Sequence, residues 1–363
     1  MIETLVLADD LTGCLECGSF LASAGAHTIA TLWPGPLPEG QAVIVDMETR
    51  HVKPEVAAQR VFAIANTARN SRVRRVYLKI DSTLRGPIGA HLNGLLAAWP
   101  AKPVIYAPAY PRMGRIVRAG CLFVNGKPLT HSVPEVLRAQ CSAEAISVAG
   151  AEELRSLLRN RLAGIYVCDA ETQADLSEIS RVVLEENASE LCAGPGGFLA
   201  ELIQASGGRF DNGKQLRAST GLIVNGSVNP VSLEQTAAAE RSGFRVLPLS
   251  SNDVAAEGDW MVLTTSSEAM PPETAAAHIA DLVNSALRSR WFDSLTIFGG
   301  DTAYHVLRAL GIETIQPLRE LLPGIPASRI QVDGRDLLLI TKAGGFGEPG
   351  AIAQIRNALL GRG

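Results

Sequence analysis

The stretch that decides the fold class runs from Val76 to Pro87 and reads VYLKIDSTLRGP. Its first part, VYLKI, is mostly apolar and rich in β-forming residues, which predicts a short buried strand. Pro87 is typical of the first turn of a helix. The charged and hydroxyl-bearing residues between the two therefore fall at the carboxyl end of a strand, just before a helix.

The same succession of strand, polar loop and helix recurs on both sides of this stretch. Such alternation indicates mostly parallel sheets covered by helices. We therefore predict an α/β fold made of two α/β domains, each a mainly parallel sheet flanked by helices. The predicted strands are Thr4–Ala8, Ala42–Val45, Val76–Ile80, Val104–Ala107, Ile165–Cys168, Glu190–Ala193, Gly221–Asn225, Phe244–Leu247, Trp260–Leu263, Leu295–Phe298 and Leu337–Ile340.

Two stretches interrupt this rhythm. Residues Arg115 to Leu129 contain an Asn-Gly pair between apolar runs, which predicts a β-hairpin inserted in the N-terminal domain. Residues Ser206 to Thr220 are polar, glycine-bearing and aperiodic, which indicates an interdomain linker. The predicted domains are accordingly residues 1–210 and residues 218–363.

Composition excludes several classes of protein. The chain has 363 residues, 47% of them hydrophobic, and its net charge is −4, whereas nucleic-acid binders usually carry a basic surplus. No apolar run reaches the length of a membrane span, and the N-terminus lacks the features of a signal peptide. We expect a cytoplasmic protein with neither nucleic acid nor membrane as a partner. Cys14 and Cys17 form a Cys-x-x-Cys without a second pair at metal-ligand spacing, so we interpret them as buried core residues and predict no protein metal site.

Two adjacent carboxylates, Asp9 and Asp10, directly follow the first predicted strand. Ligands of open α/β sheets bind at the carboxyl ends of the strands, so at least one of the two is expected to act on a ligand. These groups could accept a proton from a hydroxyl, bind hydroxyl groups or hold Mg²⁺. The alternative is that one of them only caps the following helix.

A second polar cluster follows the strand at Val76, with Lys79, Asp81, Ser82 and Arg85 as its candidates. Cations in this position suit an anionic substrate, because an arginine fork can grip a carboxylate with two hydrogen bonds. The alternative is a solvated loop with local ion pairs. Arg50, in the short polar stretch after the second predicted strand, is a candidate of the same kind.

Three loops of the C-terminal half carry glycine or serine where a strand passes into a helix. Small residues there allow backbone N–H groups to approach a phosphate closely. The pattern is neither a Walker A loop nor a dinucleotide-binding fingerprint, and simple tight turns are the alternative. The candidates for phosphate binding are Ser227, Gly299, Gly300, Asp301, Thr302, Gly344 and Gly345.

Taken together, these segments resemble the four-carbon acid sugar kinase family. ADDLTG, ETRH, KIDSTLRGPIGAHL and APAYPRMGR with LFVNGKPLT are similar to the family's N-terminal sugar-binding domain. NGSVNPVS, GGDTAYHVLRALG, PGIP and TKAGGFGEPGAI are similar to its C-terminal nucleotide-binding domain. The motifs run in the family's order from residue 8 to residue 352.

The resemblance implies a kinase that uses ATP and Mg²⁺ to phosphorylate a threonate, erythronate or 3-oxo-tetronate type of acid, usually at its terminal hydroxyl. It assigns acid-sugar binding to residues 1–210 and nucleotide binding to residues 218–363. Cys14-Leu15-Glu16 and Val228-Asn229-Pro230 depart from the family's usual Ala-Asn-Asp and Cys-Ser-Pro, which leaves the exact acid open. The residues implied for substrate and chemistry are Asp9, Asp10, Arg50, Lys79, Asp81, Ser82 and Arg85, and those implied for nucleotide are the glycine-loop candidates above.

We expect a carboxylate to be the catalytic base, because no histidine has a convincing catalytic partner in the sequence. Asp10 is favoured over Asp81, and Asp9 is expected to bind substrate instead. Two other functions stay open: a lyase or isomerase of acid sugars, and a regulator that senses a sugar acid. Neither of these should release ADP. A homodimer is compatible with the sequence.

Overall fold

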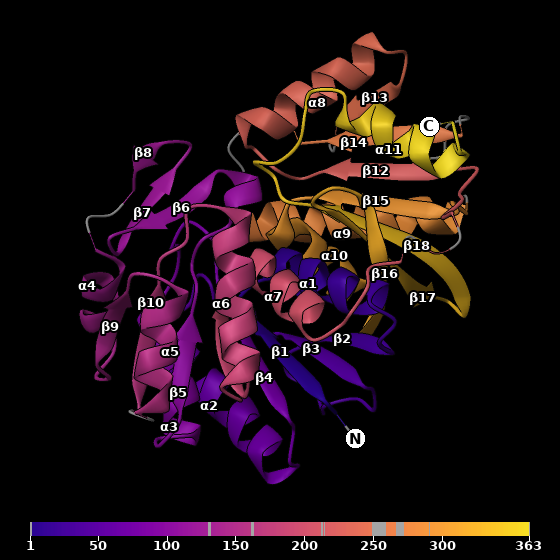
Figure 1. Ribbon diagram of the computed structural model, residues 1–363. Coiled ribbons are helices and arrows are strands. Elements are labelled where there is room, and N and C mark those ends of the chain that lie inside the picture. Colours follow the sequence, from indigo (N-terminus) through magenta and orange to yellow (C-terminus); the bar gives the residue numbers. More distant parts are fainter. Residues whose placement is uncertain are drawn as a thin grey trace. The chain divides into compact units, whose positions relative to one another are not determined.

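The computed structural model describes residues 2–129, 132–160, 163–211, 213, 215–248, 259–265, 272–289 and 291–362. The chain divides into two compact units, Met1–Phe210 and Asp211–Gly363. The boundary between them falls inside the polar stretch from Ser206 to Thr220. Each unit has its own sheet and its own helices (Figure 1).

The first unit is built on a parallel sheet. Its strands run in the order β2-β3-β1-β4-β11-β5-β10-β9, and all of these neighbours pair in parallel. The central strands are buried on both faces, as expected for a parallel sheet between two layers of helices. Their bounds are β1 (Thr4–Ala8), β2 (Thr28–Leu32), β3 (Ala42–Asp46), β4 (Arg75–Lys79), β5 (Pro103–Tyr106), β9 (Ala145–Val148), β10 (Gly164–Cys168) and β11 (Leu191–Gly194).

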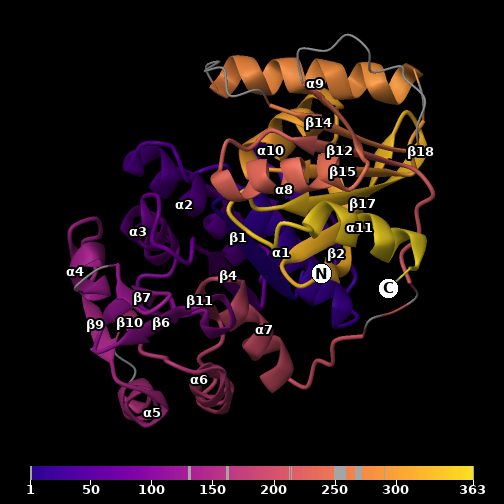
Figure 2. The same ribbon diagram turned by 90° about the horizontal axis from the view of Figure 1, so that it is seen from above.

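The helices of this unit form two rows (Figure 2). In one row α1 packs on α7, α7 on α6 and α6 on α5, and in the other α2 packs on α3 and α3 on α4. A short 3₁₀ turn, η1 (Pro111–Met113), precedes the hairpin region. The helix bounds are α1 (Leu11–Ser23), α2 (Pro54–Asn70), α3 (Ile88–Ala98), α4 (Val133–Arg138), α5 (Ala151–Arg159), α6 (Gln173–Glu185) and α7 (Gly196–Ala205).

The predicted hairpin insertion is confirmed. Strands β6 (Arg115–Arg118), β7 (Cys121–Val124) and β8 (Lys127–Pro128) form a small antiparallel sheet. Between β7 and β8, Asn125 and Gly126 have φ angles of 50° and 78°. Both angles are positive, as the Asn-Gly pair of a tight hairpin turn requires.

The second unit has a mixed sheet in the order β13-β14-β12-β15-β18-β17-β16. The pairings from β13 to β18 are parallel, whereas β17 and β16 continue the sheet in antiparallel fashion. Helix α8 packs on α11, and α9 packs on α10. The bounds are β12 (Gly221–Asn225), α8 (Pro230–Arg241), β13 (Arg245–Pro248), β14 (Trp260–Thr264), α9 (Pro272–Ser289), β15 (Ser294–Phe298), α10 (Gly300–Ala309), β16 (Thr314–Leu322), β17 (Ile325–Val332), β18 (Arg335–Lys342) and α11 (Ala351–Leu360).

The predicted fold class is confirmed, but four strands are missing from the prediction: β2 and β9 of the first unit, and β16 and β17 of the second. No strand was expected between residues 310 and 336, where β16 and β17 lie. Pro317 and Pro326 lie in these strands, and proline normally argues against an interior strand. The pairing of β16 with β17 tolerates them because its register shifts between Pro317 and Arg319 and again between Glu320, the partner of Pro326, and Leu322. Among the described helices, none is both long enough and apolar enough to cross a membrane.

Candidate active site

The first group of candidate residues lies at the carboxyl ends of the central strands of the N-terminal sheet. In the register of the sheet, Ala8 at the end of β1 lies between Asp46 of β3 and Lys79 of β4. The residues that follow these strand ends are therefore neighbours. Asp9 and Asp10 follow β1, Arg50 follows β3, and Asp81 follows β4.

Arg50 is the centre of this group. Its Nε and Nη2 atoms donate to the two carboxylate oxygens of Asp9 at 2.8 and 2.9 Å. Its Nη1 donates to Asp10, and its Nη2 lies 3.7 Å from Asp81 Oδ2. Burial disfavours the Arg50 cation, but the charges of Asp9 and Asp10 outweigh burial and raise its pKa. The guanidinium fork is thus already occupied by carboxylates of the protein.

Asp9 and Asp10 differ in exposure and in partners. Asp9 is 1% exposed, and Arg50 takes both of its oxygens. Burial raises the pKa of Asp9, and Arg50 opposes this rise. Asp10 is 8% exposed and is the N-cap of α1, because its Oδ1 accepts a hydrogen bond from the Gly13 N–H at 2.9 Å. Asp10 therefore caps the helix and also keeps a partly accessible carboxylate.

Asp81 is held by its own loop. Its Oδ1 accepts hydrogen bonds from the Thr83 N–H at 2.9 Å and the Thr83 hydroxyl at 2.6 Å. Its Oδ2 accepts from Arg85 Nη2 at 2.5 Å. Although burial acts in the opposite direction, Arg85 and Arg50 hold the pKa of Asp81 well below its usual value. A carboxylate with a depressed pKa is a weak proton acceptor.

Lys79 faces a carboxylate that the sequence analysis did not select. Its Nζ lies 4.0 Å from Glu16 Oε2, and Glu16 Oε1 accepts a hydrogen bond from the Tyr110 hydroxyl at 3.0 Å. Burial raises the pKa of Glu16, against the effect of Lys79. At Gly196, the first residue of α7, a Cβ atom would lie 2.6 Å from the Glu16 carboxylate. The unusual Cys-Leu-Glu triplet was the available signal for Glu16.

Two further arginines border the group. The Arg85 side chain is 64% exposed and pairs with Asp81 through Nη2, so other N–H groups of its fork face solvent. Arg115, the first residue of β6, is half-buried; burial lowers its pKa, and the charge of Asp81 opposes this. Arg115 was not selected from the sequence, although it ends the motif APAYPRMGR. Ser82 lies in the loop between Asp81 and Arg85.

The second group of candidates lies in the C-terminal unit, after β12, β15 and β18. These strands are parallel neighbours, and their last residues, Asn225, Phe298 and Lys342, are in register. The Gly226 N–H donates to the Phe298 carbonyl at 3.3 Å, and the Gly299 N–H donates to the Lys342 carbonyl at 2.9 Å. The three loops therefore leave the sheet side by side.

Small residues let these loops touch. A Cβ atom at Gly344 would lie 2.2 Å from Ser227 Oγ, and one at Gly226 would lie 2.2 Å from Thr302 Oγ1. Gly299 has φ 104°, which favours glycine, and it is the N-cap of α10. Gly300 and Asp301 begin α10, and Asp301 is exposed. A Cβ at Gly345 would lie 3.2 Å from Asn229 Nδ2, so this residue belongs to the same cluster of loops.

Lys342 is a buried cation beneath the last of these loops. Its Nζ donates to the carbonyl oxygens of Ala343 at 2.8 Å and Phe346 at 2.7 Å, and it lies 4.4 Å from the centre of the Phe298 ring. Burial lowers the pKa of Lys342 to about 7. The Ser232 hydroxyl supports the same loop by donating to the Gly344 carbonyl at 2.6 Å. Sequence analysis missed Lys342, although it lies two positions before Gly344.

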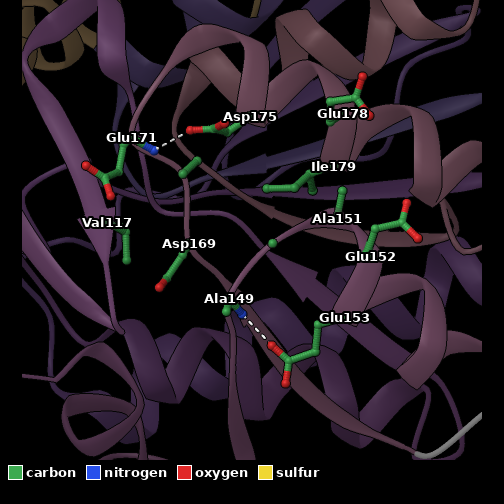
Figure 3. Close-up of a pocket in the computed structure, with 12 residues that line it drawn as sticks. Val117, Ala149, Ala151, Glu152, Glu153, Asp169, Glu171, Asp175, Glu178 and Ile179 are labelled. Carbon is green, nitrogen blue, oxygen red and sulfur yellow. Dashed lines mark hydrogen bonds between the residues drawn. The ribbon is translucent and has the colours of Figure 1, made fainter.

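A cavity of about 600 Å³ lies near the carboxyl ends of β9 and β10 (Figure 3). It is acidic, and its carboxylates serve local structure. Glu153 accepts a hydrogen bond from the Ala149 N–H at 2.6 Å, and Asp175 accepts one from the Glu171 N–H at 2.9 Å. An anionic acid sugar would be repelled here. The carboxylates lining it are Glu152, Glu153, Asp169, Glu171, Asp175 and Glu178.

Cys14 and Cys17 lie buried in α1 and are not joined by a disulfide. Burial raises the pKa of both thiols, so neither is disposed to be a thiolate. Within the described ranges, no cluster of three or more histidine, cysteine, aspartate or glutamate side chains could hold a metal ion.

Comparisons with known proteins identify the family. Residues 4–202 match the model of a sugar-binding N-terminal domain, and residues 262–352 match that of a nucleotide-binding C-terminal domain. The chain therefore belongs to the four-carbon acid sugar kinase family, as the sequence motifs predicted, and it is a carbohydrate kinase by class.

Relatives extend over nearly the whole chain. A D-threonate kinase of Cupriavidus necator is 30% identical over 404 residues, covering 96% of each chain. A 3-oxo-tetronate kinase of Methylobacterium radiotolerans is 27% identical and covers 94% of this chain and 95% of its own. Among solved structures, a Salmonella typhimurium LT2 protein with 22% identity aligns with a TM-score of 0.79 and covers 98% of both chains. A Haemophilus influenzae protein with 19% identity aligns with a TM-score of 0.74, and these two likenesses concern the fold alone.

Proposed function

We propose that the protein transfers the γ-phosphoryl group of Mg·ATP to the terminal hydroxyl of a four-carbon acid sugar of the threonate, erythronate or 3-oxo-tetronate type. The observation that carries this proposal is the contact among the three loops after β12, β15 and β18. The loops are so close that a side chain at Gly344 would collide with Ser227, and one at Gly226 would collide with Thr302. Backbone N–H groups in such loops, together with the N-terminus of α10, favour phosphate.

The N-terminal cluster supports binding of the acid. Arg85 is the cation best suited to bind the substrate carboxylate. Its side chain is largely exposed, and its pair with Asp81 uses Nη2, so other N–H groups of the guanidinium can donate to the substrate. Arg50 has a different part in this proposal. Its bidentate pair with Asp9 and its contact with Asp10 orient these two carboxylates toward the substrate hydroxyls. Lys79, Ser82 and Glu16 complete the polar surface that would bind hydroxyl groups.

Asp10 is the proposed base because it is the most exposed of the three carboxylates, at 8% against 1% for Asp9 and 6% for Asp81. Its Oδ1 accepts from the Gly13 N–H and its Oδ2 from Arg50, so exposure and not a lack of partners distinguishes it. Asp81 is a poorer candidate because Thr83 and Arg85 occupy its oxygens and lower its pKa. Asp9 is a poorer candidate because Arg50 holds both of its oxygens. Phosphoryl transfer is achieved mainly by positioning and charge stabilisation, so the base makes a moderate contribution to the rate.

The nucleotide phosphates would be held by Ser227, Gly299, Gly300, Thr302, Gly344 and Gly345, with Asp301 beside them. Mg²⁺ supplies charge neutralisation on the phosphates. In phosphate sites this ion usually keeps several waters and takes few protein ligands. Asp301 is the carboxylate of these loops best suited to bind one of those waters, because it is exposed in the first turn of α10.

The proposal is tested by measuring ADP release with a panel of tetronates, 3-oxo-tetronates and longer aldonates. We expect release that requires both Mg²⁺ and a four-carbon acid. A lyase, an isomerase or a sensing protein would bind or convert an acid without producing ADP. Absence of acid-dependent ADP release across the panel, in a protein that binds one of the acids, would contradict the proposal.

A further inference from the structure

A second cavity of the first unit, of about 300 Å³, lies near the amino-terminal ends of β1 and β4. Asp9 and Asp81 follow the carboxyl ends of the same strands, so the cavity and these carboxylates lie at opposite ends of β1 and β4. The ends of α1 and α7 cover it, and these two helices lie side by side over the sheet (Figure 1). Most of its wall is apolar, with Leu21 from α1 and Leu199, Leu202 and Ile203 from α7.

One cation lines this apolar cavity. Arg75 is the first residue of β4 and pairs with Thr4 of β1, which also lines the cavity. Because side chains alternate along a strand, Arg75, Tyr77 and Lys79 point to the same face of the sheet. The same face of β4 thus carries a cation at each end, and α1 covers both ends.

The two cations differ in their partners. Lys79 has the carboxylate of Glu16 nearby, at 4.0 Å. Arg75 is half-buried, and in the part of the chain that the structure describes its side chain has no ion-pair or hydrogen-bond partner; its Nε is fully buried. Burial and the neighbouring charge of Arg74 lower the pKa of Arg75. A buried donor without a partner is destabilising, and a bound anion would relieve that cost.

We propose that this cavity binds a small monocarboxylate with an apolar tail, with the carboxylate on the Arg75 guanidinium and the tail among Leu21, Leu202 and Ile203. Pockets for small ligands combine apolar walls with a few polar groups that fix orientation, and this cavity has that composition. The cavity lies at the other end of the strands from the proposed kinase site, and its leucine and isoleucine side chains suit an apolar tail better than the hydroxylated chain of an acid sugar. The site is therefore distinct from the proposed kinase site and takes a different class of ligand.

The test uses octanoate as the probe and equilibrium dialysis as the measurement. The wild-type protein should bind it saturably. Arg75→Met keeps the length and apolar stem of the side chain but removes the charge, so it should weaken binding at least about tenfold, the loss of one charged hydrogen-bonding partner. Arg138→Met is the matched control, since Arg138 is an exposed arginine at the end of α4 and does not line the cavity. It should bind octanoate like the wild type.

A second variant makes the test independent of Arg75. Ala24, directly after α1, lines the cavity, and Ala24→Leu should fill part of it and weaken octanoate binding while Arg75 remains. Octanol, which has the tail without the charge, should bind more weakly than octanoate. The proposal is overturned if the wild type shows no saturable binding, or if octanol binds as tightly. It is equally overturned if folded Arg75→Met, or folded Ala24→Leu, binds octanoate with wild-type affinity.

Discussion

The Nζ atom of Lys342 lies 2.7 Å from the carbonyl oxygen of Phe346, four residues further along the chain. The same ammonium donates to the Ala343 carbonyl at 2.8 Å. A single buried cation therefore closes the loop that contains Gly344 and Gly345. No carboxylate among the described residues forms an ion pair with it, so loop carbonyls and the ring of Phe298 are its main neighbours.

Lys342→Met should loosen the glycine loop and weaken nucleotide binding. Loss of a charged hydrogen-bonding partner is worth about 1.5–3 kcal/mol, so we expect the KM for ATP to rise by roughly tenfold to a hundredfold. The KM for the acid should change little. Initial-rate kinetics with each substrate varied in turn measure both constants. Arg308→Met, which removes an exposed cation from α10, is the control and should leave both unchanged.

The same lysine should make stability depend on pH. Its pKa is about 7 in the folded chain against 10.5 as the ordinary value. Between these values the unfolded chain binds more protons than the folded chain, so the contribution of Lys342 to the free energy of unfolding rises with pH. Urea unfolding of wild type and Lys342→Met from pH 7 to pH 10 measures this contribution as their difference. We expect the difference to shift in favour of the wild type as pH rises, and a difference that does not vary with pH would contradict the burial of this amine.

Gly345→Val tests the approach of phosphate to the loop. The φ angle of Gly345 is outside the left-handed region, and a Cβ there would lie 3.2 Å from Asn229 Nδ2, so the folded loop can accept a side chain with a small shift. We expect the KM for ATP to rise strongly while the KM for the acid stays near its wild-type value. Gly350→Val, at the end of the same loop where a Cβ would make only an ordinary contact, 3.8 Å from Gln354 Nε2, is the control. Equal effects of the two substitutions would contradict a specific role for Gly345.

Arg85→Lys tests recognition of the substrate carboxylate. The substitution keeps the charge but loses the planar fork, and with it the two-point contact. We expect affinity for the acid to fall by about tenfold to a hundredfold, as for one charged hydrogen bond. Direct titration of the acid in the absence of ATP gives the affinity. Arg118→Lys is a matched control, because Arg118 is an exposed arginine of the hairpin sheet that pairs with Glu171. Wild-type affinity in Arg85→Lys would remove Arg85 from the acid site.

Asp10→Asn tests the base. Asparagine can still cap α1 by accepting the Gly13 N–H, and Asp9 still holds Arg50, so the fold should persist. We expect kcat to fall at least tenfold, because general-base catalysis contributes roughly 10²–10⁴-fold, with the KM for ATP near normal. Asp81→Asn is the parallel variant, and it should act mainly on the KM for the acid by releasing Arg85. If Asp10→Asn keeps its full kcat and Asp81→Asn loses kcat instead, then Asp81 is the base and Asp10 is not.

Most of the parallel strands in both sheets could be predicted from the sequence because they are buried on both faces. Such strands appear as short apolar runs, and β1, β3, β4, β5, β10, β11, β12, β15 and β18 all lie where apolar runs were found. The strands β2 and β9 were missed because Thr28–Leu32 and Ala145–Val148 are short and mix apolar with polar residues. The prolines in β16 and β17 hid the antiparallel pair.

The sequence predicted which residues belong to the candidate site better than it predicted which side chains pair with one another there. Strand ends are visible in the sequence, so Asp9, Asp10 and Asp81 were found. The pairing of Arg50 with Asp9 depends on the strand order β3-β1-β4, which brings together residues 41 positions apart, and no local pattern encodes it. Lys342 was missed because a lysine at a strand end normally suggests an exposed residue, whereas this one is fully buried.

The proposed reaction, transfer of the γ-phosphoryl group of ATP to a four-carbon acid sugar, can be observed directly. Phosphorus NMR of the protein with Mg·ATP and D-threonate, then with D-erythronate and the 3-oxo-tetronates, follows every phosphorus-containing product at once. We expect, for at least one of these acids, a new phosphomonoester signal that grows in step with ADP and couples to the protons of the terminal carbon. ATP that stays unchanged with every four-carbon acid, or that yields only ADP and inorganic phosphate, would contradict it.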